Sequence, residues 1–237
     1  MQSAAQFVRE AVKALKPLAD AQKAVGMAAY MRGQFVYLGV STPDHRAAIG
    51  PLIREFKPES AVELCAAVDA LWKKREREYQ YVALGLLGRY NAVLSAADMP
   101  WLLGLVQQKS WWDTVDSLAK TVGAVVRQSG AKGKQQMDRA ARHKDFWVRR
   151  IAMLHQLGWR GETDTARLFD YARLLAPEKE FFIRKAIGWG LRDYAWHDWR
   201  AIEAFLQAEG KQFSGLTRRE AAKNIPALKV RGIKIVD

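Results

Sequence analysis

The sequence predicts an all-α protein, and three features of its 237 residues indicate this fold class. Apolar residues recur every three or four positions in successive segments, which is the spacing of helices with one buried face. Proline, glycine, asparagine and aspartate separate these segments at short intervals, as is typical of helix ends. Only residues 34–40 resemble a strand, and no second run of this kind could pair with them, so we interpret them as a buried connection.

The first part of the chain contains six predicted helices. They cover residues 3–16, 20–31, 42–56, 59–73, 76–90 and 98–107. Ser3 and Asp20 are the expected N-caps of the first two helices, because their side-chain oxygens can accept backbone N–H groups there. Thr42 and Pro43 are the expected N-cap and first residue of the third helix.

Residues 109–116, Lys-Ser-Trp-Trp-Asp-Thr-Val-Asp, begin a further predicted helix that extends to about residue 127. Ser110 is its expected N-cap, and Asp113 in the first turn is favoured by the helix dipole. Projected at about 100° per residue, a set of apolar side chains forms one stripe that faces a core. These side chains are Trp111, Val115, Leu118, Ala119, Val122, Val125 and Val126.

Trp112 and Asp116 lie beside this stripe. Because they are four residues apart on a helix, they are surface neighbours, and an aromatic ring and a carboxylate share one patch. The alternative is structural: Trp112 at the edge of the core, with Asp116 paired to Lys120 on the surface. Spacing alone favours the structural alternative, since most such pairs have no catalytic role.

Two stretches after this helix carry notable positive charge. Residues 129–142 combine a glycine-interrupted basic loop, at 130–134, with a short polar helix. The loop could contact phosphate or be a solvated charged surface. In the predicted helix at 144–158, Arg150 projects into the apolar stripe. A buried arginine needs a partner, so Arg150 either reaches a carboxylate within the fold or lines a wet, anion-facing cleft.

The last predicted helices include one with an aromatic and basic face. They cover residues 163–175, 178–195, 198–208 and 216–225, and the basic residues 230–237 follow as a tail. In the second of these helices, Trp189 shares a face with Phe181, Lys185 and Arg192, a composition suited to a nucleic acid backbone. The alternative is a tryptophan packed on a neighbouring helix under basic side chains. Thr217-Arg-Arg-Glu220 is the expected capping box of the last helix.

Composition points to a polyanionic partner. Lys and Arg total 38 against 25 acidic residues, which gives a formal net charge of +13 and an isoelectric point of about 9.9. Nucleic acid fits this charge better than anionic lipid does. No apolar run approaches the roughly 20 residues of a membrane span, and no signal peptide is recognisable, so we expect a soluble, cytoplasmic protein that does not bind membranes.

Metal and cofactor sites are not expected. Cys65 is the only cysteine, which excludes an internal disulfide and a cysteine-rich metal site, and we expect it to be a small core residue. The four histidines lack zinc-ligand spacing. Walker, Gly-x-Gly-x-x-Gly and Gly-x-Ser-x-Gly motifs are also absent from the sequence.

The helix pattern favours a solenoid. Pairs of about 35 to 45 residues fit divergent HEAT-like repeats within a single domain, residues 1–237, although an irregular α-bundle would also fit. In a solenoid, the second helix of each pair lines a concave surface. Trp112, Asp116, Arg150, Trp189 and Arg192 could converge there. The residues alone therefore predict a basic, all-helical nucleic-acid binder.

Several of these segments also resemble a known family, the AlkD-like alkylpurine DNA glycosylases. The matching segments are Lys109 to Asp116, Phe146 to Ala152, Lys179 to Tyr194, Tyr30 to Pro43 and Leu216 to Ala221. The resemblance implies a right-handed α-solenoid of HEAT-like repeats whose basic concave face holds duplex DNA. It also implies hydrolysis of the N-glycosidic bond of cationic N3- and N7-alkylated purines, which leaves an abasic site and begins base excision repair.

The resemblance assigns roles by motif position. Asp116 would be the catalytic carboxylate, Trp112 and Trp189 would lie against the deoxyribose of the lesion, and Arg150 and Arg192 would grip phosphates. Tyr30 would lie near the site, and the basic face around Trp189 adds Lys185 to the expected DNA contacts. Family members act without flipping the damaged base into a pocket. The matched motifs contain no lysine where a Schiff-base nucleophile is expected, which predicts a monofunctional glycosylase.

Two rival functions stay open at this level: a non-catalytic helical-repeat protein that binds or recognises damaged DNA, and an RNA-binding solenoid. The retained carboxylate disfavours a pure binder, because a negative charge facing phosphates weakens binding. We expect a monomer in a bacterial cytoplasm, associated with the nucleoid through DNA. Gly190, after Trp189, stands where a bulkier apolar residue is ordinary and is expected to loosen the helix locally.

Overall fold

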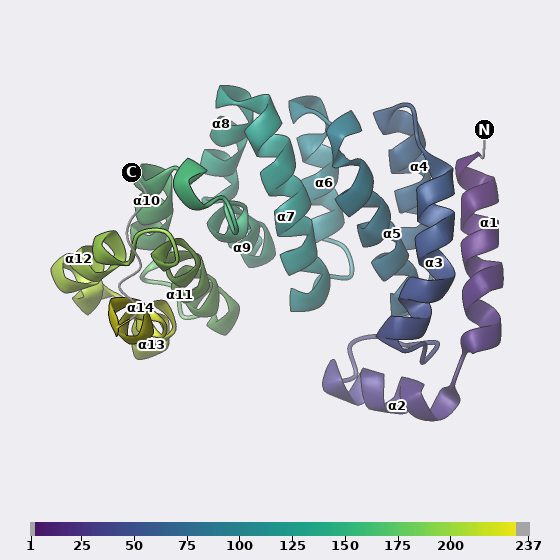
Figure 1. Cartoon of the computed structure of the whole chain (residues 1–237), viewed down its shortest axis with the longest axis horizontal. Helices are drawn as coiled ribbons and strands as arrows, with labels where there is room; N and C mark the ends of the chain where they lie inside the picture. Colours follow the sequence, from purple (N-terminus) through teal and green to yellow (C-terminus); the bar gives the residue numbers. More distant parts are fainter. Residues whose placement is uncertain (1–2, 231–237) are drawn as a thin grey trace. The chain divides into compact units, whose positions relative to one another are not determined.

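The computed structural model describes residues 3–230, and the regular secondary structure of this part of the chain is helical (Figure 1). It contains 14 α-helices and five short 3-10 helices. Within these residues, the only β-type pairing is an isolated parallel bridge between Val36 and Glu76. The predicted all-α fold class is therefore confirmed.

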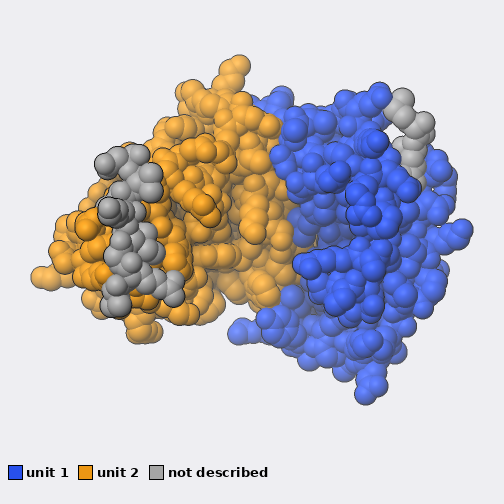
Figure 2. All heavy atoms as spheres, viewed as in Figure 1, with its two compact units in different colours: residues 1–98 blue, residues 99–237 orange. Residues whose placement is uncertain are grey.

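The chain divides into two compact units, residues 1–98 and residues 99–237 (Figure 2). The helices of the first unit are α1 Ala4–Leu15, α2 Ala21–Tyr30, α3 Thr42–Phe56, α4 Ala61–Trp72 and α5 Arg77–Tyr90. Those of the second are α6 Met99–Val106, α7 Trp112–Ser129, α8 Ala131–Ala140, α9 Phe146–Leu154, α10 Thr165–Leu175, α11 Phe181–Ala195, α12 Trp199–Glu209, α13 Gly215–Ala222 and α14 Ile225–Val230. A single domain and a right-handed solenoid with a basic concave face stay predictions.

Local capping explains where the first helices begin. Gln6 N donates to Ser3 Oγ at 3.2 Å, and Asp20 Oδ1 accepts from two backbone N–H groups at 3.0 Å, so both predicted N-caps are confirmed. The third predicted cap is wrong by one residue. Ser41 caps α3 by accepting from Asp44 N, which places Pro43 in the second helical position.

The connection at residues 34–40 is held by one buried carboxylate of α5. Glu78 is 1% exposed and accepts from the backbone N–H groups of Leu38, Gly39 and Val40 at 2.9, 2.8 and 3.2 Å. These bonds replace the partner strand that the segment lacks, because buried backbone groups need acceptors. The segment is a connection as predicted, but only Tyr37, Gly39 and Val40 of the expected buried run are buried.

The second unit is built around a series of neighbouring helices. Helix α7 packs on α9, α9 packs on α11, and α11 packs closely on α13. The predicted stripe of α7 lies in this core. Val115, Leu118, Ala119, Val122, Val125 and Val126 are all 0% exposed. The helical spacing of apolar residues therefore identified the buried face of α7 correctly.

Three local predictions in the second unit are wrong. Ser110 does not cap α7, because its hydroxyl donates to Val106 O at 2.6 Å instead. Residues 130–134 are not a loop, because α8 begins at Ala131. Thr217 does not start a capping box. Ser214 caps α13 by accepting from Thr217 N at 3.1 Å, which leaves the Glu220 side chain available for other partners.

Only the first residue of the predicted tail at 230–237 is described. This residue, Val230, is the last residue of α14, and residues 231–237 lie outside the described part of the chain. None of the helices described is long and apolar enough to cross a membrane.

Candidate functional site

A bidentate ion pair links two helices of the second unit. Arg150 Nε and Nη2 on α9 donate to Asp116 Oδ1 and Oδ2 on α7 at 2.7 and 2.9 Å. Arg150 Nη1 also donates to the carbonyl oxygen of Phe182 on α11. One guanidinium therefore joins α7, α9 and α11.

The two members of the pair differ in exposure. The Arg150 side chain is 3% exposed, whereas that of Asp116 is 17% exposed. The carboxylate thus has a partner on its inner side and an accessible outer edge. Burial raises the pKa of Asp116 above its ordinary value, and the hydrogen bonds and positive charge of Arg150 oppose that rise. The fork geometry of the guanidinium fixes both carboxylate oxygens in one plane.

This arrangement decides between the two interpretations of Arg150. Its partner is a carboxylate within the fold, and Asp116 is hydrogen-bonded to Arg150 rather than to Lys120. The three hydrogen bonds of Arg150 to Asp116 and Phe182 use three of the five N–H groups of its guanidinium. Arg150 therefore holds Asp116 in place, and its expected contact with a phosphate stays a prediction.

Two adjacent tryptophans at the start of α7 have different surroundings. The Trp111 ring lies 6.0 Å from the Trp147 ring and 5.3 Å from the Phe182 ring, centroid to centroid, and the latter two rings are 4.7 Å apart. This aromatic cluster ties α7 to α9 and α11. Trp112 is the first residue of α7, half-buried, one turn before Asp116. The predicted neighbours Trp112 and Asp116 thus lie one turn apart on one helix, and Asp116 belongs to the ion pair.

Helix α11 presents an aromatic and basic face. Phe181, Lys185, Trp189 and Arg192 recur at intervals of three or four residues, so they lie along one side of the helix. Phe181 is 55% exposed, whereas the ring of Phe182 packs against Trp111 and Trp147. Trp189 is half-buried.

Gly190 does not loosen α11, which is continuous from Phe181 to Ala195. A Cβ at Gly190 would lie 3.0 Å from Met153 Cε and 3.2 Å from Met153 O, so the glycine lets α9 pack closely here. The expected local loosening is wrong, because close helix packing compensates for the low helix propensity of glycine.

Glu220 on α13 is an ion-pair partner of two predicted site residues, and the sequence did not reveal this pairing. Lys185 Nζ lies 2.8 Å from Glu220 Oε2, and Arg192 Nη1 forms an ion pair with Glu220 Oε1. The predicted DNA contacts Lys185 and Arg192 therefore share one carboxylate. Interpreting Glu220 as part of a capping box concealed this role, and its only other signal in the sequence was its negative charge near a basic segment.

A family model described as DNA alkylation repair enzyme matches residues 11–225 of the chain. The chain belongs to this family. A solved structure of a predicted DNA alkylation repair enzyme from Enterococcus faecalis is 31% identical, with a TM-score of 0.78, over 86% of this chain and 95% of that one.

A more distant relative supports the fold alone. The structure of Pseudomonas fluorescens alkylpurine DNA glycosylase AlkC, bound to DNA containing an abasic site analog, is 11% identical with a TM-score of 0.54. The match covers 94% of this chain and 62% of that one. No curated protein sequence matches the chain.

Tyr30 belongs to the first unit. It is the last residue of α2, and 72% of its surface is exposed. Its expected position near the other site residues stays a prediction.

The half-buried Cys65 on α4 has a pKa raised by burial to about 11, which makes its thiol a poor nucleophile.

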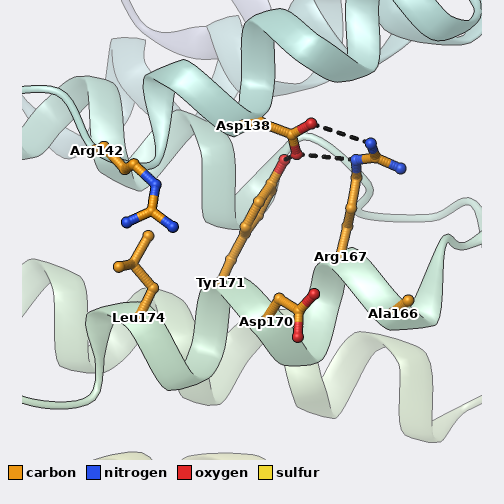
Figure 3. A pocket seen from close by; sticks show the side chains of 7 residues that line it. All are labelled: Asp138, Arg142, Ala166, Arg167, Asp170, Tyr171 and Leu174. Atoms are coloured by element: carbon orange, nitrogen blue, oxygen red, sulfur yellow. Dashed lines mark hydrogen bonds and ion pairs between the residues drawn. The ribbon is translucent and has the colours of Figure 1, made fainter.

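The second unit of this family member also contains a polar pocket between α8 and α10, with a volume of about 340 Å³ (Figure 3). Its central carboxylate, Asp138, accepts from Arg167 Nε and Nη2 at 2.9 and 3.0 Å and from Tyr171 Oη at 2.6 Å. The carboxylate of Asp138 is therefore engaged in contacts within the fold, and none of the predicted site residues lines the pocket. Within residues 3–230, no group of three or more His, Cys, Asp or Glu side chains could hold a metal ion.

Proposed function

We propose that this protein is an AlkD-like DNA glycosylase. It hydrolyses the N-glycosidic bond of cationic N3- and N7-alkylated purines in duplex DNA and leaves an abasic site. Membership of the DNA alkylation repair family supports this reaction class. The observation that carries the proposal is the partly exposed Asp116 carboxylate, fixed from behind by Arg150 and placed one turn after Trp112.

The proposed chemistry requires little acid catalysis. An alkylated purine already carries positive charge, so it leaves readily as a neutral base. The demanding part is the sugar, which becomes oxocarbenium-like as the bond breaks. A fixed carboxylate stabilises that cation and can orient the attacking water on the same face. Burial raises the pKa of Asp116, and Arg150 opposes this rise because it stabilises the ionised form of the carboxylate.

The other residues bind DNA in this proposal. Trp112 and Trp189 offer aromatic faces to the deoxyribose of the lesion, where a ring face also attracts the developing cation. Lys185 and Arg192 contact phosphates, and Tyr30 approaches the same DNA. Arg150 acts as a positioning residue for Asp116.

The product is a free base and an intact abasic strand. Lys185, the lysine on the α11 face, forms an ion pair with Glu220, which suits a phosphate contact rather than a Schiff-base nucleophile. The enzyme is therefore monofunctional. It acts on the lesion without rotating the base into a pocket.

The test is release of free 7-methylguanine from an N7-methylated duplex and of 3-methyladenine from a duplex that contains it, resolved by chromatography. Wild-type protein should release a base, and the Asp116→Asn variant should bind the duplex without releasing it. A folded wild-type protein that binds both duplexes and releases nothing would instead be a damage-recognition module. Preferential binding of structured RNA in competition would assign the protein to RNA.

A further inference from the structure

Three charged side chains form one cluster on the face of α11 that carries Trp189. Lys185 and Arg192 flank Trp189 on the same face of α11, about 10 Å apart along the helix axis. Both are ion-paired with Glu220 of α13, at 2.8 Å from Lys185 Nζ to Glu220 Oε2. The three side chains are 41%, 20% and 11% exposed for Lys185, Arg192 and Glu220.

The carboxylate is held in place by the packing of α13 on α11. A Cβ at Gly188 would lie 2.5 Å from Glu220 Cβ and 2.9 Å from Thr217 O, so only glycine allows this approach. Thr217 Oγ1 also donates to Arg184 O on α11 at 3.0 Å. Glu220 follows Thr217 by three residues and is therefore directed at the basic face of α11.

The electrostatic consequence concerns DNA binding. Without Glu220, α11 would present two positive charges beside Trp189; with it, the cluster carries a net charge of one. A DNA phosphate that approaches Lys185 or Arg192 must displace or share this carboxylate. Because phosphate contacts supply most of the binding that is independent of sequence, the carboxylate weakens binding to damaged and undamaged duplexes alike.

We propose that Glu220 is a built-in competitor of the DNA backbone for Lys185 and Arg192, and that it sets how readily the protein leaves DNA. The proposal rests on the DNA-binding role of α11 in the proposed function. It predicts that the chemical step is independent of Glu220, whereas dissociation from undamaged duplex and from the abasic product depends on it.

The experiment compares the wild type, Glu220→Gln and Glu209→Gln for binding to undamaged duplex over a range of salt concentrations. Glu209 is a matched control, since it forms an ion pair with Arg173 between α12 and α10 and its replacement changes the net charge equally. Glu220→Gln should bind about two- to fivefold more tightly at low salt. Its slope of log affinity against log salt should steepen by up to about 0.9 for one more phosphate neutralised. Glu209→Gln should match the wild type.

Base release on N7-methylated duplex provides the second readout. With Glu220→Gln, single-turnover release should keep its rate while multiple-turnover release slows, because the abasic product leaves later. If Glu220→Gln melts at a lower temperature than the wild type, both measurements are repeated with Glu220→Ala, because alanine has a high helix propensity.

Unchanged or weaker binding by the Glu220 variants, or an equal gain in Glu209→Gln, would overturn the proposal. So would a failure of both Glu220 variants to fold, because the carboxylate would then serve the α11–α13 interface. The failure of this inference is distinguishable from that of the glycosylase. If the wild type releases a base but Glu220→Gln binds the duplex no more tightly, only this inference is wrong. If Glu220→Gln binds more tightly but no variant releases a base, only the glycosylase proposal is wrong.

Discussion

Glu78 in the first unit and Asp116 in the second are both carboxylates inside helical packing, yet their surroundings differ. Glu78 is 1% exposed and accepts three backbone N–H groups of the connection at 34–40. Asp116 is 17% exposed and has one buried cationic partner, Arg150. The carboxylate oxygens of Glu78 are enclosed by backbone donors and fix the conformation of the connection. The carboxylate of Asp116 is fixed by Arg150 and stays partly exposed, which the proposed function requires.

The largest expected effect on stability is at Glu78. Glu78→Gln removes a charged acceptor from three buried N–H groups and should lower the free energy of unfolding by about 3 kcal/mol. The measurement is chemical denaturation followed by circular dichroism. Glu76→Gln, two residues earlier in the half-buried N-cap position without a side-chain cap bond, is the control, with an expected change below about 0.5 kcal/mol. Equal losses in the two variants would remove the special role of Glu78.

A second test concerns the pH dependence of base release, which the ionisation of Asp116 should control. In the proposed mechanism the reacting form of Asp116 is the anion, and burial raises the pKa of Asp116 in the folded protein. Base release should therefore fall as pH decreases, at a pH above the value near 3.9 that is ordinary for aspartate. Release in buffer alone is subtracted at each pH, since acid also cleaves these bonds.

Replacement of Arg150 should move this acid limb. Arg150 lowers the pKa of Asp116 through hydrogen bonds and charge, so Arg150→Gln should shift the limb to higher pH and reduce kcat by about 10²-fold. Arg150→Lys retains the charge without the bidentate fork and should shift the limb less. An acid limb that stays in place in both variants would show that another group titrates.

The smallest expected effects separate the two adjacent tryptophans. Trp111→Leu should lower the free energy of unfolding by about 2 kcal/mol, because its ring belongs to the cluster with Trp147 and Phe182. Trp112→Leu should lower stability less and slow base release more. Thermal melts and single-turnover rates of base release on both variants test this difference. A larger loss of stability in Trp112→Leu and a larger loss of rate in Trp111→Leu would contradict it.

Helix faces and several helix caps could be predicted from the sequence, whereas the ion-pair partners of the site residues could not. The buried face of α7 and the caps at Ser3 and Asp20 depend on residues within a few positions, and these predictions are confirmed. Ser110 failed because a serine hydroxyl can serve the helix that follows or the carbonyl four residues before it, and only the packed structure selects one.

Ion pairs between helices could not be read from spacing. Asp116 and Arg150 are 34 residues apart, and Lys185 and Glu220 are 35 residues apart, so their meeting depends on how α7, α9, α11 and α13 pack. The positions of Trp112, Asp116 and Trp189 came from motif resemblance together with helical spacing. The buried place of Arg150 and the carboxylate of Glu220 required the structure.

The most direct test of Asp116 as the reacting carboxylate is single-turnover release of 7-methylguanine at enzyme concentrations that saturate the duplex. Wild type, Asp116→Asn and Asp113→Asn are compared, because Asp113 lies on the same helix and its replacement changes the charge equally. Asp116→Asn should lose at least about 10²-fold in rate while it still binds the duplex, and Asp113→Asn should stay close to the wild type. Comparable rates for Asp116→Asn and the wild type would contradict the catalytic role of this carboxylate.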